Sequence, residues 1–298
     1  MYAAIDLGTN SCRLLVGEVE NGTLHIHHDR WEVVQLGRGV DATGRLDPER
    51  VEAVVALLAD YARDCDRFGV EQVAAVATSA MRDAADADRF LARVHHDTGL
   101  SLEVISGDAE ARLSFRAGLA GLPGPPPEEV VVIDFGGGST EVIYGRTGRV
   151  ATAVSLDVGS RRMLERFLSA DPPTEAEWQA MMDHLHAALA PLPSPGDAAP
   201  LVGVGATVFH LSAMLFGGDG QRPFDTEELA PLTQRIRTTP MAARRNFIGL
   251  DPSRADVIVA GCGLVAAILD RFRRPIQPSP YSLRHGLLLD RFGPPTDR

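Results

Sequence analysis

The sequence predicts an α/β protein built from two related domains. Apolar runs of strand length alternate with segments of helical periodicity along the whole chain, as in α/β folds. The chain has 298 residues, which suits two domains of roughly 150 residues each. A strand–Asp-x-Gly loop–strand pattern also occurs twice, with matching residues at a constant spacing, which suggests duplicated halves.

The first half begins with the first copy of this pattern. An apolar strand over Tyr2–Leu7 runs into Asp6-Leu-Gly-Thr-Asn-Ser11, a second strand covers Cys12–Glu18, and Asn21-Gly22 is a strong hairpin signal. The next elements that we predict are a helix over Val51–Phe68, a strand over Val73–Ala77 closed by a polar loop at Thr78–Arg82, a helix over Ala84–Gly99, a strand over Leu102–Ser106 and a helix over Asp108–Gly118.

The Gly/Pro-rich segment Gly121–Pro127 is the best linker candidate, and the pattern returns after it. When the two copies are aligned without gaps, Asp6, Gly8, Ser11 and Gly17 coincide with Asp134, Gly136, Ser139 and Gly145. We predict strands over Val130–Ile133, Val142–Tyr144 and Leu201–Val204, and helices over Arg161–Phe167, Glu175–Leu189, Val208–Leu215, Asp256–Phe272 and Ser282–Phe292.

Composition and charge exclude several functions. The formal net charge is −11 and the pI is near 5.3, which argues against non-specific nucleic-acid binding. All 29 basic residues are Arg, so chemistry that needs a catalytic or phosphate-binding Lys is excluded. Cys12, Cys65 and Cys262 form no pair, the N-terminus lacks a signal-peptide pattern and no apolar run is long enough to span a membrane. We therefore expect reduced thiols in a cytoplasmic protein that binds neither nucleic acid nor membrane.

The two Asp-x-Gly loops have the composition of anion-binding sites. Glycines let backbone N–H groups approach an anion closely, and Ser and Thr hydroxyls add donors. Three consecutive glycines at Gly136–Gly138 cost backbone entropy and have no evident structural purpose. Asp134 and Glu141 lie on either side of this loop, where both carboxylates could reach one Mg²⁺; a capping or solvated pair is the alternative.

The sequence resembles the exopolyphosphatase/guanosine pentaphosphate phosphohydrolase (Ppx/GppA) family in its short, two-domain form. The resemblance runs from Ala3 to about Phe292. Its motifs, in the family's order, are Asp6-Leu-Gly-Thr-Asn-Ser, Thr78-Ser-Ala-Met-Arg82, Ser106-Gly-Asp-Ala-Glu-Ala-Arg-Leu113, Val132-Ile-Asp-Phe-Gly-Gly-Gly-Ser-Thr-Glu141 and Gly203-Val-Gly-Ala-Thr207. It implies two ribonuclease H-like domains of the actin/hexokinase/Hsp70 superfamily, with an active-site cleft between them. We expect the first domain at residues 1–121, joined by the C-terminal helix at about 281–298, and the second at 122–280.

The resemblance also implies residue roles. Glu110 is expected to be the catalytic base that activates water, with Asp108 as its nearest rival. Asp134, Glu141 and Asp6 are expected to bind Mg²⁺ or Mn²⁺. Many relatives have Gly-Gly-Thr where this chain has Gly205-Ala206-Thr207, which weakens the expectation that this segment approaches the phosphate closely. The residues expected to bind the substrate phosphate are Asn10, Ser11, Arg82, Gly136, Gly137, Gly138, Ser139, Thr140 and Gly205.

Three functions remain open at this stage. The first is Mg²⁺-dependent hydrolysis of the terminal phosphate of inorganic polyphosphate. The second is removal of the 5′-phosphate from guanosine pentaphosphate, and the third is a non-catalytic sensor of polyphosphate or nucleotide. The resemblance further predicts a homodimer. Preferred chain length, processivity and K⁺ dependence have no signal in the sequence.

Overall fold

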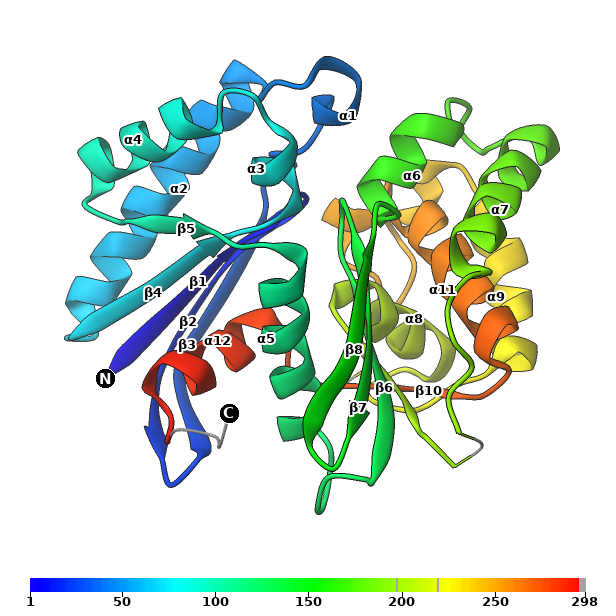
Figure 1. Ribbon diagram of the computed structural model, residues 1–298. Coiled ribbons are helices and arrows are strands. Elements are labelled where there is room, and N and C mark those ends of the chain that lie inside the picture. Colours follow the sequence, from blue (N-terminus) through cyan, green and yellow to red (C-terminus); the bar gives the residue numbers. More distant parts are fainter. Residues whose placement is uncertain (197, 219, 295–298) are drawn as a thin grey trace. The chain divides into compact units, whose positions relative to one another are not determined.

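Two five-stranded mixed sheets organise the computed structural model of the chain (Figure 1). The structure describes residues 1–196, 198–218 and 220–294. The chain forms two compact units, which we describe separately. Unit 1 comprises Met1–Ala117 and the chain from Leu283 onward, and unit 2 comprises Gly118–Ser282. The predicted two-sheet α/β class is confirmed, and the predicted cleft between domains stays a prediction.

The sheet of unit 1 has the strand order β3-β2-β1-β4-β5. Strands β1 (Tyr2–Leu7), β2 (Ser11–Glu20) and β3 (Thr23–Val33) form an antiparallel meander. Strands β4 (Gln72–Ala77) and β5 (Leu102–Val104) extend the sheet in parallel beyond β1. The β2–β3 turn is the predicted hairpin: Asn21 and Gly22 both have positive φ, as a type I′ turn requires.

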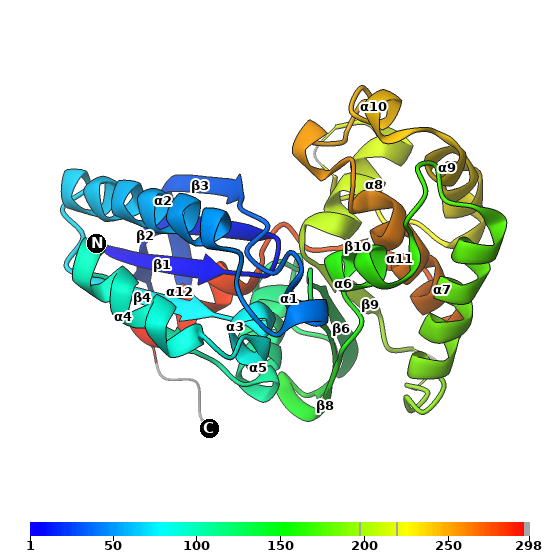
Figure 2. The ribbon, with the colours of Figure 1, turned by 90° about the horizontal axis from the view of Figure 1, so that it is seen from above.

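Alternation along β1 directs its side chains to two helical layers. Ala3 and Ile5 pack in one cluster with residues of α2 (Pro48–Arg67) and α4 (Ala87–Thr98), whereas Ala4 packs with α5 (Gly107–Ala120) and α12 (Leu283–Phe292) on the opposite face. Figure 2 shows α2 and α4 on the face toward the viewer. The short helices α1 (Val40–Thr43) and α3 (Ser79–Asp83) lie in the connections. Because both faces of β1 are covered, the strand carries the near-continuous apolar run seen in the sequence.

The sheet of unit 2 repeats the same topology. Strands β6 (Glu129–Phe135), β7 (Thr140–Arg146) and β8 (Arg149–Leu156) form the meander, and β9 (Leu201–Val204) and β10 (Ile276–Pro278) add in parallel, giving the order β10-β9-β6-β7-β8. Even the irregularities match: the register shifts between Val16 and Gly17 in unit 1 and between Tyr144 and Gly145 in unit 2. These positions coincide in the same gapless alignment that relates the two sequence motifs.

The apolar core of unit 2 lies between its sheet and a group of helices (Figure 1). Alternate residues of β6, including Val131 and Ile133, point into it, and α11 contributes residues along its whole length. The helices of this unit are α6 (Ser160–Phe167), α7 (Glu175–Leu189), α8 (Ala206–Phe216), α9 (Thr226–Thr238), α10 (Met241–Arg244) and α11 (Ile258–Phe272), and Pro252–Arg254 forms a 3₁₀ turn.

Most predicted elements are present, with shifts of a few residues at their ends. The predicted polar loop Thr78–Arg82 is wrong, because Ser79–Asp83 forms one helical turn at the end of β4. The edge strands β3 and β8 and the helix α9 had no predicted bounds. Helix α9 contains Pro231, which obscures its periodicity, although Asp225 and Glu228 form a capping box at its start.

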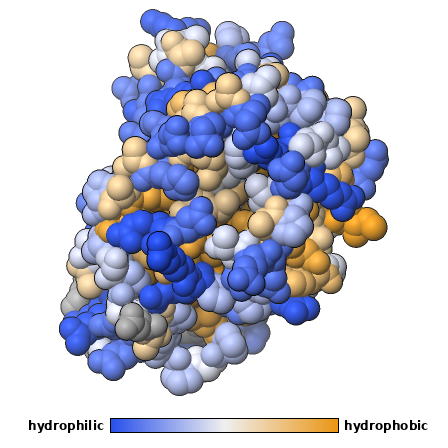
Figure 3. Space-filling model, turned by 90° about the vertical axis from the view of Figure 1, so that its right-hand side faces the viewer, coloured by the Kyte–Doolittle hydropathy of each residue, from blue (hydrophilic) through white to orange (hydrophobic). Residues whose placement is uncertain are grey.

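All three cysteines are buried as free thiols, as the sequence indicates. No helix within the described residues is long and apolar enough to cross a membrane. Hydrophilic residues predominate on the face shown in Figure 3, with apolar residues interspersed among them. The predicted cytoplasmic location and homodimer stay predictions.

Candidate functional site

The second Asp-x-Gly hairpin places two carboxylates on one face of the sheet of unit 2. Asp134 on β6 and Glu141 on β7 are directly opposed in the antiparallel register, so their side chains emerge on the same side. Glu141 is completely buried and its Oε1 accepts a hydrogen bond from the Ser155 hydroxyl at 2.8 Å, whereas Asp134 retains slight exposure. The pair therefore joins one carboxylate at the surface with one fixed behind it.

The loop between these strands, Gly136–Ser139 (loop 2), is held by the start of α6. The N–H of Ser160 donates to the carbonyl of Gly136 at 3.1 Å. The N–H groups of Arg161 and Arg162 donate to the carbonyl of Gly137 at 2.8 and 3.1 Å. The Arg162 guanidinium donates through Nε to the carbonyl of Gly138 at 2.7 Å. Three successive loop carbonyls thus point toward α6: two satisfy its first N–H groups, and the third accepts from the Arg162 side chain.

Peptide geometry determines the direction of the N–H groups of loop 2. In a planar trans peptide the N–H points opposite to the carbonyl of the preceding residue. The N–H groups of Gly137, Gly138 and Ser139 are therefore directed away from α6. Among the backbone hydrogen bonds of the described residues, none uses the N–H of Gly137 or Gly138 as a donor. Successive N–H groups aimed in one direction form a site for an anion such as phosphate.

Close packing explains why glycines are needed here. A Cβ on Gly136 would lie 2.6 Å from the carbonyl oxygen of Ser139, and one on Gly159 would lie 2.5 Å from the backbone of Gly137 and Gly138. Gly159 precedes α6, so only a residue without a side chain lets the helix approach loop 2 closely enough for the contacts above.

The turn after β9 approaches the same carboxylate. Gly205 has φ +103°, and a Cβ there would lie 3.0 Å from the carbonyl oxygen of Phe135 and 3.2 Å from Oδ1 of Asp134. Helix α8 starts at the next residue, Ala206, without a side-chain cap. The glycine that the geometry requires is therefore Gly205 itself, and Ala206 already belongs to the helix.

The first hairpin uses the same construction in unit 1. Its loop, Gly8–Asn10 (loop 1), turns back through an N–H of Gly8 that donates to Ser11 at 2.9 Å, as Gly136 does to Ser139 at 3.1 Å. The carbonyl of Thr9 accepts from Gly37 at 2.9 Å, and that of Asn10 accepts from Val34 and Gln35, both at 3.0 Å. The N–H groups of Asn10 and Ser11 are consequently directed away from this segment.

The carboxylate of loop 1 differs in its electrostatics from that of loop 2. Arg13 occupies the position opposite Asp6 that Glu141 occupies opposite Asp134. Burial raises the pKa of the Asp6 carboxyl above its ordinary value of 3.8, and the charges of Arg13 and Arg284 oppose this rise. Arg284 on α12 is itself held by a two-point ion pair with Asp29 of β3, at 2.8 and 3.2 Å. Unit 1 thus places guanidinium groups around its loop carboxylate.

The predicted base and the predicted phosphate-binding Arg contact each other within unit 1. Arg82 Nη1, on α3, donates to Oε2 of Glu110 at 2.7 Å and to the carbonyl of Ile105 at 3.0 Å. Glu110 lies in the first turn of α5 and is buried, while Arg82 is partly exposed. The pair fixes the direction of the carboxylate and leaves part of the guanidinium accessible to an anion.

The carboxylates of unit 2 fit a hard divalent cation. No group of three or more His, Cys, Asp or Glu side chains in the described part of the chain could enclose a metal ion. Mg²⁺, however, is commonly held by one or two carboxylates together with substrate phosphates and water. Asp134 and Glu141, beside a loop with outward N–H groups, match that pattern.

Several predicted site residues are thus neighbours within their own unit: Asp6 with loop 1, Arg82 with Glu110, and Asp134 and Glu141 with loop 2 and Gly205. Thr140 is completely buried and its hydroxyl donates to the carbonyl of Val158, so this contact commits the hydroxyl to the fold. The sequence analysis missed Gly159 and Arg162. The repeat could have found Arg162, because Val34, which binds loop 1, coincides with it when the two halves are aligned on their Asp-x-Gly motifs.

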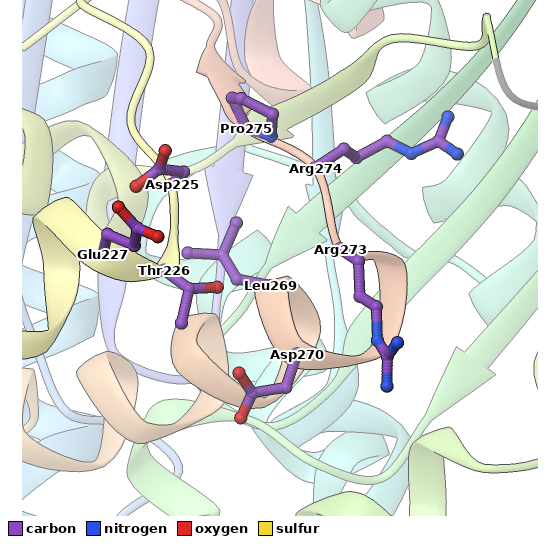
Figure 4. Close-up of a pocket in the computed structure, with 8 residues that line it drawn as sticks. All are labelled: Asp225, Thr226, Glu227, Leu269, Asp270, Arg273, Arg274 and Pro275. Atoms are coloured by element: carbon purple, nitrogen blue, oxygen red, sulfur yellow. The ribbon is translucent and has the colours of Figure 1, made fainter.

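A separate pocket of about 450 Å³ lies in unit 2 where α9 begins and α11 ends (Figure 4). Its carboxylates are structural at least in part, since Asp225 caps α9. Arg274 extends away from them in Figure 4 and donates to the carbonyls of Gly196 and Ala199. None of the predicted site residues is among the described residues that line this pocket.

The fold defines a class of α/β proteins with two mixed sheets of matching topology, each of which carries a Gly-rich hairpin loop. The sequence profile of the Ppx/GppA phosphatase family matches residues 15–293, and the chain belongs to this family. The resemblance stated from the motifs is thereby confirmed.

Named relatives agree with this assignment. Exopolyphosphatase 2 of Mycobacterium tuberculosis is 36% identical over 294 residues, which cover 91% of this chain and 90% of that protein. A solved structure of the Aquifex aeolicus member of the Ppx/GppA family is 34% identical, with a TM-score of 0.80 and coverage of 97% of this chain and 96% of the other. An exopolyphosphatase from Cytophaga hutchinsonii is 25% identical, with a TM-score of 0.87 and coverage of 96% of each chain.

The raised pKa of Asp6 predicts a pH-dependent cost to stability. A carboxyl with a raised pKa favours the folded state below 3.8, and this contribution is lost as pH rises through the folded-state pKa. Asp6→Asn should therefore raise the free energy of unfolding at pH 7, and the gain should shrink as pH falls toward 4. Calorimetric melting between pH 4.5 and 7.5 measures this difference. Asp183→Asn, at an exposed position on α7, is the control; a gain that is independent of pH would contradict the argument.

Proposed function

We propose that this protein is an exopolyphosphatase, which hydrolyses the terminal phosphate of inorganic polyphosphate with the aid of a divalent cation. The observation that carries the proposal is loop 2, whose N–H groups are directed away from α6 beside the carboxylate of Asp134. Such donors suit the oxygens of a terminal phosphoryl group. The 36% identity to an exopolyphosphatase over most of both chains supports the choice of substrate.

The proposed reaction needs a general base, a group that binds the terminal phosphate, and a positive charge that neutralises the phosphate oxygens. Glu110 takes a proton from water as the water oxygen attacks the terminal phosphorus. The bond from that phosphorus to the bridging oxygen breaks, which releases inorganic phosphate and a chain shorter by one unit. Arg82, already directed at Glu110, binds the terminal phosphoryl oxygens, so the water and its base are held on the same side of the phosphorus.

The N–H groups of loops 1 and 2 bind phosphate oxygens and stabilise the charge that they carry in the transition state. We assign the Thr140 side chain to holding loop 2 in shape, in keeping with its contact to Val158. Asp134 and Glu141 would hold Mg²⁺ or Mn²⁺. Asp6 is also proposed as a ligand of this cation. The cation, when bound, would neutralise phosphate oxygens and polarise the terminal phosphorus.

Substrate comparison tests the proposal directly. Phosphate release is measured from long-chain polyphosphate and from guanosine pentaphosphate at matched concentrations, with Mg²⁺, with Mn²⁺ and with chelator. We expect polyphosphate to be hydrolysed faster and the activity to disappear with chelator. Preferential release from the nucleotide would replace the proposal by the sister activity. Tight polyphosphate binding without any phosphate release would make the protein a sensor.

Removal of the base should nearly abolish turnover. General-base catalysis is typically worth about 10²–10⁴-fold, so Glu110→Gln should lower kcat by at least about a hundredfold while the circular dichroism spectrum stays unchanged. Asp108→Asn is the matched control, because Asp108 lies exposed in the same first turn of α5. Loss of activity in Asp108→Asn but not in Glu110→Gln would exchange the two assignments.

Removal of the phosphate grip should affect both kinetic constants. Arg82→Ala should raise KM for polyphosphate and lower kcat, because a guanidinium that binds the transferred group acts in the transition state as well as in the ground state. Arg89→Ala, at an exposed position on α4, is the control. KM should also rise as ionic strength increases above about 0.1 M, where the Debye length falls below about 10 Å. If KM does not change with ionic strength and Arg82→Ala leaves kcat and KM unchanged, Arg82 does not bind the transferred phosphate.

A further inference from the structure

We propose that Arg162 is a positioning residue, which acts on the substrate phosphate through the backbone of loop 2. This inference rests on the proposed function for its substrate, although its geometric basis lies entirely within unit 2. The Nε of Arg162 donates to the carbonyl of Gly138 at 2.7 Å, and this side chain is only 8% exposed. The guanidinium is thus a fixed part of the wall behind the loop.

The contact determines the orientation of one particular peptide group. The carbonyl of Gly138 and the N–H of Ser139 belong to the same planar unit and point in opposite directions. While Arg162 holds the carbonyl, the N–H of Ser139 stays directed toward the phosphate side of the loop. Gly138 has no Cβ to restrict its own torsion angles, so the neighbouring backbone provides little resistance to rotation of this peptide.

The other two peptides of loop 2 are held differently. The carbonyls of Gly136 and Gly137 accept from backbone N–H groups at the start of α6, which no substitution of a side chain removes. The corresponding peptide of loop 1, between Asn10 and Ser11, is also held by backbone donors, those of Val34 and Gln35. The peptide between Gly138 and Ser139 is instead anchored by the Arg162 side chain, and it is therefore sensitive to a point substitution.

Arg161 supplies a matched control on the same helix. It is 5% exposed, and its guanidinium pairs with Asp256 at 2.6 Å and approaches Glu165. Its backbone N–H donates to the carbonyl of Gly137 in loop 2. Substitutions at Arg161 and Arg162 thus remove similarly buried charges from adjacent positions, and Arg162→Met removes the guanidinium that donates to the Gly138 carbonyl.

The kinetic test compares Arg162→Met with Arg161→Met in the full-length protein with polyphosphate and Mg²⁺. A mispositioned donor in a preorganised site typically costs about ten- to a hundredfold. For Arg162→Met we expect that loss in kcat/KM, with kcat affected at least as much as KM. For Arg161→Met we expect a loss of less than threefold, which corresponds to about 0.65 kcal/mol. Arg162→Lys should recover part of the loss, because an ammonium can donate to the same carbonyl. A lysine variant no better than methionine would contradict the hydrogen-bond argument.

A second measurement separates this inference from the proposed function. Amide NMR signals of Gly138 and Ser139 are followed while tripolyphosphate is added to the metal-free protein. We expect both signals to shift in wild type and in Arg161→Met, and the shift of Ser139 to be lost in Arg162→Met. If wild type shows the shifts but hydrolyses nothing, the proposed function fails and the positioning role stands. If Arg162→Met retains wild-type kinetics and shifts, the positioning role fails and the function stands. Should Arg162→Met not fold, Arg162→Leu, which also has no donor, replaces it under the same criteria.

Discussion

Loops 1 and 2 depend on one constraint: every carbonyl that is turned inward must be satisfied by the protein behind it. An unsatisfied buried carbonyl costs free energy comparable to a lost hydrogen bond. In unit 2 this need is met by the first N–H groups of α6 and by Arg162. The approach of α6 in turn requires the missing side chain of Gly159. The glycines of loop 2 and Gly159 before α6 therefore both allow the loop and the helix to pack closely against each other.

Duplication preserved this construction while the chemistry of the two hairpins diverged. Both units keep the meander, the bulge at an equivalent glycine and a loop with its carbonyls directed inward. They differ in the residue opposite the Asp, which is Arg13 in unit 1 and Glu141 in unit 2. An Asp–Arg pair is close to neutral, whereas an Asp–Glu pair attracts a cation. The same scaffold thus places a guanidinium opposite the Asp in one copy and a second carboxylate opposite it in the other.

The sequence predicts the strands and helices that carry strong periodicity, and the reasons for the exceptions are local. Glu175–Leu189 and Leu201–Val204 are predicted to the residue, because a capping box and a short, fully buried run mark their ends. Edge strands such as β8 lack such a signal, since none of the residues of β8 is buried. Site residues can be predicted from the sequence where the residue type itself carries the chemistry, as at Glu110 and Asp134. Gly159 and Arg162 act through backbone contacts formed only after β8 and α6 pack on the loop, so local sequence gives no hint of them.

The charge balance of the protein gives the loops their importance. A chain with a net charge of −11 repels a polyanion at long range. Several guanidinium groups do not offset this freely, because Arg82 pairs with Glu110, Arg284 with Asp29 and Arg161 with Asp256. Outward N–H groups attract phosphate oxygens without adding net charge, and they need no counter-ion when the substrate leaves. Short-range dipoles that are fixed by the fold can therefore select a phosphate terminus even where the overall field of an acidic protein opposes its approach.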